Sequence, residues 1–487
     1  MEAKEEAKEV TLKVDDVEVK AKEGATILDV AKKMGINVPT LCYSSALEPF
    51  GACRLCSVEI VDKRGRKRIV TSCNYPVEEG LVVYTKSDKV IQTRKVLLEL
   101  LLARCPKVKK IQDMAKEYDV QKPKFWISDE EEDCILCGLC ARVCEEKVGI
   151  YGINFAKRGV EREVTTPYHK LSSDCIGCGA CAVVCPTNSK KLQINTYPTL
   201  PKDVERLEQQ FLTGLKDENL GVYNDIFAAK STIDGQDGGV ATALLASGMQ
   251  RGLFDAAIVV QRTDGYRAEA VVAENVDDII KARGTKYLRV KMMPKLGELI
   301  DKGKKKIAIV GTACEVRAAR KIQERLLDEF PDLDLTIIGL FCFEAFDYEK
   351  LKEETQRLLS VDLDKAEKTQ IHKGKFIVRT EGKEYSTSVR DLSKAVEKGC
   401  AFCDDFTGRL ADISVGSVGS EDGYSTIIVR SEKGKKLLEN IDLTRGNVNK
   451  EEIAKLSILK KNRAKKSFAP IMQDMQVQPP PEMRQAP

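Results

Sequence analysis

Two cysteine runs decide how the middle of this chain folds: DCILCGLCARVCEE at 133–146 and DCIGCGACAVVCPT at 174–187. Both runs have the spacing C-x2-C-x2-C-x3-C, which binds two 4Fe-4S clusters when two such runs fold together. In that arrangement the fourth cysteine of each run binds the cluster of the other run. The spacing therefore predicts one cluster on Cys134, Cys137, Cys140 and Cys185, and a second on Cys175, Cys178, Cys181 and Cys144. Pro186 follows the last cysteine as the pattern expects, whereas Glu145 replaces the proline after Cys144.

Length, charge and cysteine content limit what surrounds these runs. With 487 residues the chain is too long for one ordinary core, so several domains are expected. Lys and Arg number 79 against 75 Asp and Glu, a balance that gives no reason to expect nucleic acid as a partner. The longest apolar run, VLLELLLA at 96–103, contains Glu99 and is too short to form a membrane-spanning helix. The charged start does not resemble a secretory signal, so we expect a cytoplasmic protein whose 17 cysteines mostly bind metal.

Residues 8–88 predict a second kind of cluster. Alternating apolar residues on both sides of Asp15 and Asp16 indicate a hairpin, and a helix is expected from about Thr26. The hairpin, the helix and a cysteine loop spaced C-x10-C-x2-C-x16-C are typical of a β-grasp ferredoxin with a 2Fe-2S cluster. The alternative is a structural zinc site, although such sites usually have two short C-x2-C pairs and this segment has one. The four ligands are Cys42, Cys53, Cys56 and Cys73.

Two linkers join the predicted domains. Residues 89–124 have apolar positions at helical spacing and predict a helical linker, in which the single thiol of Cys105 has no assigned role. Residues 125–198 are expected to form the bacterial-type ferredoxin with two 4Fe-4S clusters. A second linker, 199–219, leads from there into a region of different composition.

The N-terminal part has a family resemblance. Residues 10–190, with LLELLLARCP at 97–106 and the two cysteine runs, resemble the electron-transfer subunits of bidirectional hydrogenases and the start of the large iron–sulfur subunit of respiratory complex I. The resemblance departs at Cys105, where complex I has an additional cluster with His and Cys ligands. The two histidines of this chain, His169 and His372, lie elsewhere.

Residues 220–467 predict an α/β domain. Apolar strands such as AAIVV and KIAIVG alternate with helical stretches. The segment STIDGQDGGVATALLASG at 231–248 places three glycines directly before a helix start, where backbone amides can approach a phosphate. By itself this signal is weak, because a glycine-rich turn is more often only a turn.

Five motifs in a fixed order carry a second resemblance: GQDGGV (235–240), ARGTKY (282–287), VGTAC (310–314), IGLFCFEAF (338–346) and KGCAFCDDFTGRLADISVGSVGSEDGYSTIIVR (398–430). From about Asp225 to Gly434 the chain resembles the beta subunit of coenzyme F-420 (F420) hydrogenase and the related subunits of formate dehydrogenase and F420H2 dehydrogenase from methanogenic and related archaea. The resemblance implies a flavin-binding domain that carries FAD and one 4Fe-4S cluster and exchanges hydride with the deazaflavin F420.

The same resemblance implies which residues contact the flavin. Lys286 is the candidate catalytic residue, because a cation near the flavin N1 and C2 carbonyl would stabilise the reduced ring. Outside this context a lysine is most often a solvated surface charge, and residues 416–419 could be a plain turn. The predicted flavin contacts are Gly235, Gln236, Asp237, Gly238, Gly239, Thr285, Lys286, Tyr287, Gly416 and Gly419.

A fourth cysteine set remains. Cys314 and Cys342 each follow a predicted strand, and strand ends on one edge of an α/β sheet converge. These two residues can therefore meet Cys400 and Cys403 around a third 4Fe-4S cluster beside the flavin. The alternative is that Cys314 and Cys342 are buried core thiols and that the C-x2-C is a redox pair.

Taken together, the sequence predicts a converter between two-electron and one-electron chemistry. FAD would exchange hydride with F420, and the clusters would carry single electrons to or from a partner such as a hydrogenase, formate dehydrogenase or heterodisulfide reductase subunit. Two other functions stay open: an NAD(P)H- or ferredoxin-linked flavoprotein reductase, and a non-catalytic electron-wire adaptor. No G-x-G-x-x-G motif follows a strand in this sequence, which counts against a nicotinamide site of the Rossmann type. The segment 468–487, rich in Pro and Gln, is expected to be a disordered tail.

Overall fold

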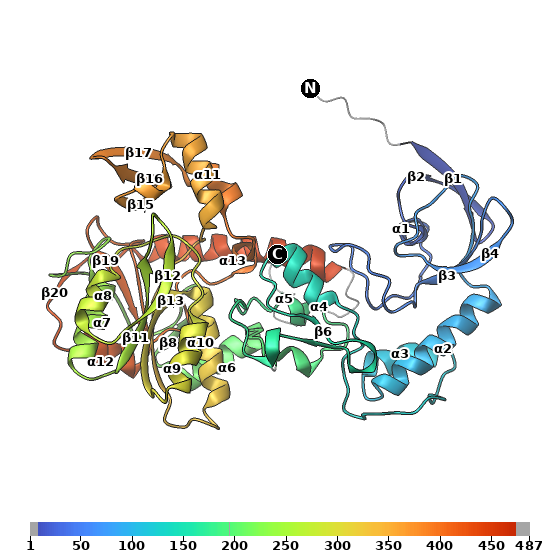
Figure 1. The fold of residues 1–487 in the computed structure, drawn as a ribbon, viewed down its shortest axis with the longest axis horizontal. Coiled ribbons are helices and arrows are strands. Elements are labelled where there is room, and N and C mark those ends of the chain that lie inside the picture. The colour runs from blue at the N-terminus through green and yellow to red at the C-terminus, as the bar shows by residue number, and fades with distance from the viewer. Residues whose placement is uncertain (1–7, 194, 474–487) are drawn as a thin grey trace.

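The computed structural model describes residues 8–193 and 195–473. Three units follow one another along the longest axis, with the N-terminal unit at one end, the cysteine-run unit in the middle and a large α/β unit at the other end (Figure 1). Within these ranges, no helix combines the length and the hydropathy that a membrane span requires.

The N-terminal unit is a five-stranded mixed sheet with one helix. The strand order is β2-β1-β5-β3-β4, in which β1 and β5 are parallel and the other neighbours are antiparallel. The predicted hairpin is present, with Asp15 and Asp16 at positive φ in its turn. Thr26 is the N-cap of the predicted helix and forms a capping box with Asp29. The elements are β1 (Glu9–Val14), β2 (Val17–Lys22), α1 (Ile27–Lys33), β3 (Ser57–Val61), β4 (Lys67–Thr71) and β5 (Val82–Tyr84).

Two helices connect this sheet to the middle unit, as the helical periodicity predicted: α2 (Asp88–Arg104) and α3 (Lys109–Glu117). The buried Arg94 of α2 donates hydrogen bonds to the carbonyls of Leu55 at 3.2 Å and Ser57 at 2.8 Å. These bonds hold α2 against the end of the N-terminal cysteine loop.

The middle unit contains two short helices, each of which begins inside a cysteine run. Gly138 and Gly179 adopt the left-handed conformation, with φ of 76° and 78°, so the chain turns sharply before the third cysteine of each run. The elements are α4 (Leu139–Arg142), η1 (Val143–Val148), β6 (Asn154–Ala156), η2 (Gly159–Glu161), β7 (Glu163–Thr165), η3 (Pro167–His169), α5 (Ala180–Val183) and η4 (Lys190–Gln193).

The large unit is an eight-stranded mixed sheet with helices on both faces. Its order is β12-β11-β13-β14-β18-β19-β10-β20, and β11, β13, β14 and β18 form a parallel centre. Because both faces are covered, these strands are apolar on both sides: Ile258 and Ile309 pack with α6, α9 and α10, whereas Val259 and Ala308 pack with α7, α8 and α12. The elements are α6 (Pro201–Phe211), which lies in the predicted second linker, β8 (Leu215–Asp217), β9 (Gly221–Tyr223), β10 (Asp225–Ser231), α7 (Val240–Gln250), β11 (Ala256–Arg262), β12 (Ala268–Ala273), α8 (Val276–Lys281), α9 (Met293–Asp301), β13 (Lys306–Thr312), α10 (Ala313–Leu326), β14 (Asp334–Leu340), β18 (Ile413–Gly416), β19 (Ser425–Val429), α12 (Glu432–Leu438) and β20 (Leu443–Gly446).

A small antiparallel sheet, β15-β16-β17, is inserted between β14 and β18 and stands on the large unit beside α11 (Figure 1). Its core contains Phe346, Phe376 and Leu392. The elements are α11 (Tyr348–Leu359), η5 (Leu363–Lys365), β15 (Lys368–His372), β16 (Lys375–Thr380), β17 (Lys383–Ser388), η6 (Val389–Ala395) and η7 (Lys398–Phe402).

The last helix, α13 (Lys450–Gln473), joins the large unit to the middle unit. Phe468 meets Phe402 edge-on, with ring centroids 5.2 Å apart, and Ile471 packs in the same apolar cluster as Val143 of the middle unit. The helix continues through residues 468–473 of the predicted tail, and residues 474–487 lie outside the described residues.

Candidate functional site

The four N-terminal cysteines lie in the loop before β3 and just after β4. Their thiols form two contacting pairs, Cys42 with Cys53 and Cys56 with Cys73, and Cys42 Sγ also accepts a hydrogen bond from the Cys53 amide at 3.4 Å. The hydrogen bond from the Cys53 thiol lowers the pKa of Cys42 to about 6. Two thiol pairs fit a two-iron cluster with four cysteine ligands. In the described ranges, no three His, Cys, Asp or Glu side chains are grouped to hold a single metal ion.

In the middle unit, each cysteine run closes a cavity with a thiol from the other run. One cavity is lined by Cys134, Cys137, Cys140 and Cys185, with Val164 and Lys191 beside them. The other is lined by Cys175, Cys178, Cys181 and Cys144, with Ile150 and Ile176 beside them. These are the two groupings that the spacing of the runs predicts.

The surroundings of these cavities fit an anionic iron–sulfur cluster. The Gly152 amide donates to Cys144 Sγ at 3.3 Å, and the Tyr197 amide donates to Cys175 Sγ at 3.2 Å. Burial raises the pKa of Cys175 to about 11 and that of Cys178 to about 12, so thiolates here need a positively charged partner, which iron would supply.

The structure brings the fourth cysteine set together at one edge of the large sheet. β13 and β14 are parallel neighbours, and Thr312 pairs with Leu340 two residues before Cys314 and Cys342. The thiol of Cys342 interacts electrostatically with those of Cys314, Cys400 and Cys403. This convergence of strand ends is the arrangement that the sequence predicts for a third 4Fe-4S cluster.

Two cations of α13 hold the peptide groups around the fourth set. Lys460 Nζ donates to the carbonyl of Cys342, and Arg463 donates to the carbonyls of Phe343 at 2.7 Å and Cys400 at 3.1 Å. Sequence reasoning missed both residues, because they lie beyond the motifs of this domain and form no motif of their own.

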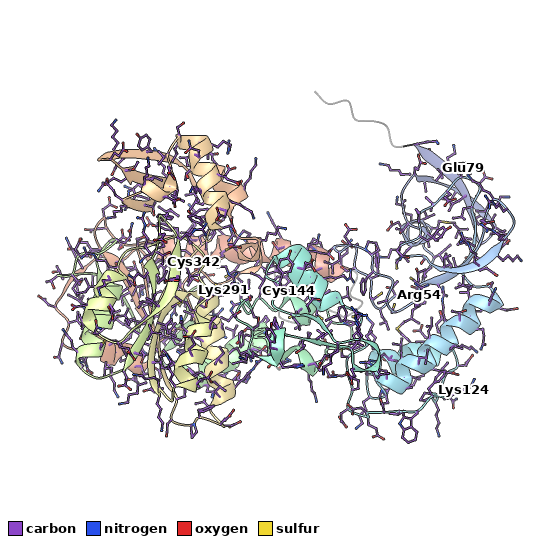
Figure 2. All side chains as sticks on the ribbon, in the orientation of Figure 1. Arg54, Glu79, Lys124, Cys144, Lys291 and Cys342 are labelled. Atoms are coloured by element: carbon purple, nitrogen blue, oxygen red, sulfur yellow. The ribbon has the colours of Figure 1, made fainter. Side chains whose placement is uncertain are left out.

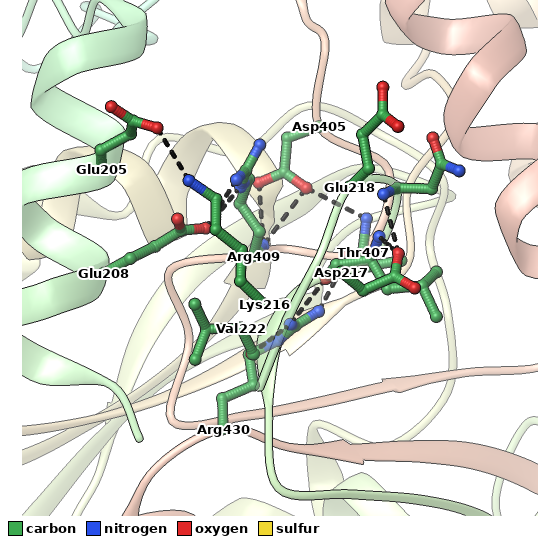
Figure 3. Close-up of polar contacts among 12 residues, drawn as sticks. Glu205, Glu208, Lys216, Asp217, Glu218, Val222, Asp405, Thr407, Arg409 and Arg430 are labelled. Atoms are coloured by element: carbon green, nitrogen blue, oxygen red, sulfur yellow. Dashed lines mark hydrogen bonds and ion pairs between the residues drawn. The ribbon is translucent and has the colours of Figure 1, made fainter. Parts of the chain in front are cut away.

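A polar network fixes the loop after Cys403 (Figure 3). The Asp405 carboxylate accepts hydrogen bonds from the amides of Gly408 at 2.9 Å and Arg409 at 3.0 Å, and Arg409 pairs with Glu208 of α6 at 2.7 Å.

The fully buried Arg430 also holds this loop. It donates to the carbonyls of Leu220 and Val222 at 2.7 and 2.9 Å, and to the hydroxyl of Thr407 at 2.9 Å. The position of Cys403 therefore depends on groups from three distant parts of the chain.

The middle unit contacts the cysteine-bearing segments on both of its sides. On the N-terminal side, Arg142 of α4 donates to the Cys42 carbonyl at 2.8 Å. On the other side, Arg317 of α10 pairs with Asp404 at 2.6 Å and lies against Gly177, which sits between two cysteines of the second run. Lys291 pairs with Asp174 at the same boundary, where Figure 2 shows Cys144 and Cys342 in the two adjoining units.

The predicted flavin loop is shaped by its own neighbours. A Cβ on Gly238 would lie 2.6 Å from the Ala229 carbonyl and 2.8 Å from the Ser425 amide, and a Cβ on Gly239, at φ 67°, would lie 1.9 Å from the Ile233 carbonyl. The chain's own backbone thus accounts for both glycines without a ligand.

Polar groups of two predicted flavin motifs meet at β15. Gln236 Nε2 donates to the Thr369 carbonyl at 3.1 Å, and the Tyr287 hydroxyl accepts from the Ile371 amide at 2.9 Å. Burial raises the pKa of the nearby Asp237 carboxyl, which also interacts with Lys368. The structure therefore gathers residues 235–239 and 285–287 around β15, a strand that the sequence analysis did not connect with the flavin.

Lys286 is bound within its own loop. Its Nζ donates to the carbonyls of Ala282 at 2.5 Å, Arg283 at 3.1 Å and Gly284 at 2.9 Å. Burial, together with the charge of Arg262, lowers the pKa of Lys286 to about 8. The neighbouring Thr285 is exposed.

The third predicted flavin motif, 416–419, ends β18. A Cβ on Gly416 would lie 2.2 Å from the Phe341 ring, and a Cβ on Gly419, at φ 84°, would lie 2.6 Å from the Asn449 carbonyl. Close packing inside the domain therefore explains these glycines as well. The turn that follows them places Asp422 3.8 Å from His372 of β15.

Comparison with known proteins matches four stretches of the chain to families. Residues 226–296 and 304–456 match the N-terminal and C-terminal parts of the family described as coenzyme F420 hydrogenase/dehydrogenase, beta subunit. Residues 7–88 match the 2Fe-2S iron–sulfur cluster binding domain, and residues 104–189 match the 4Fe-4S dicluster domain.

Relatives are found among F420-linked proteins. The coenzyme F420 hydrogenase subunit beta of Methanococcus voltae is 35% identical over 269 residues, which cover 51% of this chain and 95% of that protein. The coenzyme F420-dependent sulfite reductase of Methanocaldococcus jannaschii is 38% identical over 257 residues, which cover 50% of this chain but only 40% of that protein. A chain of the F420-reducing NiFe hydrogenase complex from Methanosarcina barkeri superimposes with a TM-score of 0.50 at 32% identity, covering 52% of this chain and 94% of that chain.

The ferredoxin-type domains and the mixed α/β unit define an iron–sulfur electron-transfer protein. The chain belongs to the coenzyme F420 hydrogenase/dehydrogenase beta subunit family, and the same chain carries a 2Fe-2S domain and a 4Fe-4S dicluster domain before the family region. The resemblance of this chain to the beta subunit of F420 hydrogenase, which the sequence indicates, is thereby confirmed.

Proposed function

We propose that this chain exchanges hydride between F420 and a bound FAD and passes single electrons along four clusters to or from a partner redox subunit. The observation that carries the proposal is the unbroken series of contacts between the cysteine sets. The set at 314, 342, 400 and 403 adjoins the second cavity of the middle unit through Arg317 and Gly177, and the middle unit adjoins Cys42 through Arg142. FAD, when bound, would supply the conversion between hydride and one-electron chemistry.

The residues around β15 support the location of the flavin. Gln236, Asp237 and Tyr287 bring donors and acceptors to one place, and that place belongs to the family region rather than to the ferredoxin-type domains. Since Gly238 and Gly239 are required by the backbone itself, these polar side chains are better evidence for the site than the glycines. We propose that Lys286 acts here through its charge.

The order of the N-terminal sheet supports the β-grasp interpretation. Its strands, its single helix and the cysteine loop follow one another along the chain in the order that this kind of ferredoxin requires. The 2Fe-2S cluster in this unit would form the end of the series, where a hydrogenase, formate dehydrogenase or heterodisulfide reductase subunit would exchange electrons.

Anaerobically purified protein tests the proposal. We expect about 14 irons per chain, one FAD and rapid reduction of a one-electron dye by F420H2. Zinc in place of two of the irons would support the zinc alternative for the N-terminal site. Dye reduction by NAD(P)H but not by F420H2 would favour the flavoprotein reductase, and protein without flavin would favour the adaptor.

A matched pair of variants tests the flavin site. Asp237→Asn should weaken FAD binding about tenfold, because it changes a half-buried polar group of the site. Asp234→Asn changes an exposed carboxylate in the same loop and should leave FAD binding as in the wild type. Equal FAD affinity of the two variants would contradict the location.

A further inference from the structure

The helix α13 places a buried cation against the fourth cysteine set. The side chain of Lys460 is only 2% exposed, and its Nζ donates to the Cys342 carbonyl. The ammonium also interacts electrostatically with the thiols of Cys403, Cys342 and Cys400. The charge of one side chain therefore acts on three of the four proposed ligands.

Lys460 differs from Arg463 and Arg317, two other cations near the fourth set, because it has no direct counter-ion among the described residues. Arg463 is paired with Glu344 at 2.7 Å, and Arg317 is paired with Asp404 at 2.6 Å. For Lys460, no carboxylate of the described residues lies at ion-pair distance, and Asp405 interacts with it only from farther away. The charge of Lys460 is thus available to the cysteine set.

We propose that Lys460 raises the reduction potential of the 4Fe-4S cluster held by the fourth set. This inference rests on the proposed fourth cluster. Reduction adds one negative charge to a cluster, and a fixed cation beside it stabilises the more negative state. Because the site is buried, solvent and salt screen this interaction little.

Lys460 is thus a positioning and tuning residue rather than a ligand. Its hydrogen bond to the Cys342 carbonyl would hold one ligand segment in place, and its charge would set the potential. The two roles can be separated, because an amide side chain such as Gln can donate the hydrogen bond without carrying the charge.

Redox titration followed by electron paramagnetic resonance tests this inference. The signal of the fourth cluster is first identified as the one that Cys400→Ser removes. In Lys460→Met and Lys460→Gln, the equilibrium between its reduced and oxidised forms should shift at least tenfold toward the oxidised form, which is about 59 mV for a one-electron couple. In Lys460→Arg, which keeps the positive charge, the reduction potential of the cluster should stay close to the wild-type value. Lys465→Met, an exposed lysine of the same helix, should leave every signal unchanged.

The outcomes separate the two proposals. If Cys400→Ser removes no signal that the wild-type protein shows, the proposal of a fourth cluster is overturned. A retained cluster with an unchanged potential in Lys460→Gln overturns the tuning role. Loss of the cluster in both uncharged variants, with retention in Lys460→Arg, would mean that the charge is needed for assembly and would also overturn tuning.

Discussion

The middle unit and the large unit both gather cysteines in fours, but by different means. In the middle unit, two short runs turn at left-handed glycines and exchange their last cysteines. In the large unit, Cys314 and Cys342 come from two strand ends, whereas Cys400 and Cys403 follow an inserted sheet. The first arrangement is determined by local turns, and the second depends on a correctly assembled eight-stranded sheet.

This difference predicts how each site responds to mutation. A site made by local turns should be sensitive mainly to its ligands and glycines. A site made by distant segments should also be sensitive to residues that hold those segments together, such as Arg430, Arg317 and Lys460.

The largest expected effect is the loss of a whole cluster. Cys144→Ser should remove about four irons, because Cys144 lines the cavity of the second run, and Cys400→Ser should remove about four from the fourth set. Iron analysis and electron paramagnetic resonance measure both losses.

Double variants test the exchange of cysteines between the runs. Cys144→Ser combined with Cys178→Ser should lose no more iron than the single variant, since both residues line one cavity. Cys144→Ser combined with Cys137→Ser should lose about eight irons, since the two residues line different cavities. The reverse pattern would show that each run binds its own cluster.

The next largest effect concerns stability. Arg430→Met leaves the carbonyls of Leu220 and Val222 without their donor in a buried place, so it should lower the free energy of unfolding by about 3 kcal/mol or more. Guanidinium chloride denaturation followed by circular dichroism measures the change, and cluster absorbance should fall along with it. Arg445→Met is the control, because its exposed guanidinium stacks on Phe227, a contact worth about 0.5–1 kcal/mol. Equal losses in the two variants would contradict the role of Arg430.

The same difference explains how much could be predicted from the sequence. The two cavities of the middle unit could be predicted because cysteine spacing fixes local geometry. The fourth set followed from the general convergence of strand ends, but Lys460 and Arg463 did not, because contacts between α13 and residues 342–400 leave no periodic or spaced signal. The sequence predicts the glycines at 238, 239 and 416 as flavin contacts, and this stays a prediction. The structure adds another reason for glycine at these positions, which is close backbone and ring packing.

A smaller effect is expected at Lys286. If its charge acts on the flavin, Lys286→Met should keep FAD bound and slow the reduction of the flavin by F420H2. The activation free energy of this step should rise by about 2–4 kcal/mol. Single-turnover stopped-flow absorbance measures this step separately from later electron transfer. Lys281→Met, which removes an exposed cation of α8 paired with Asp278, is the control. An unchanged rate would leave Lys286 with the role that its three carbonyl contacts show, which is to close its own loop.

The smallest effect is expected at Cys105, the one cysteine outside the four sets. Its thiol is fully buried at the end of α2, and burial raises its pKa to about 12, so it should remain protonated and apolar in character. Cys105→Ala should leave the iron content unchanged and cost about 1 kcal/mol of stability through the small cavity it creates. Cys53→Ala is the matched comparison, because the same substitution in a proposed ligand should remove about two irons. Loss of iron in Cys105→Ala would instead mean that this thiol binds a cluster and that the ligands of this chain are not confined to the four sets.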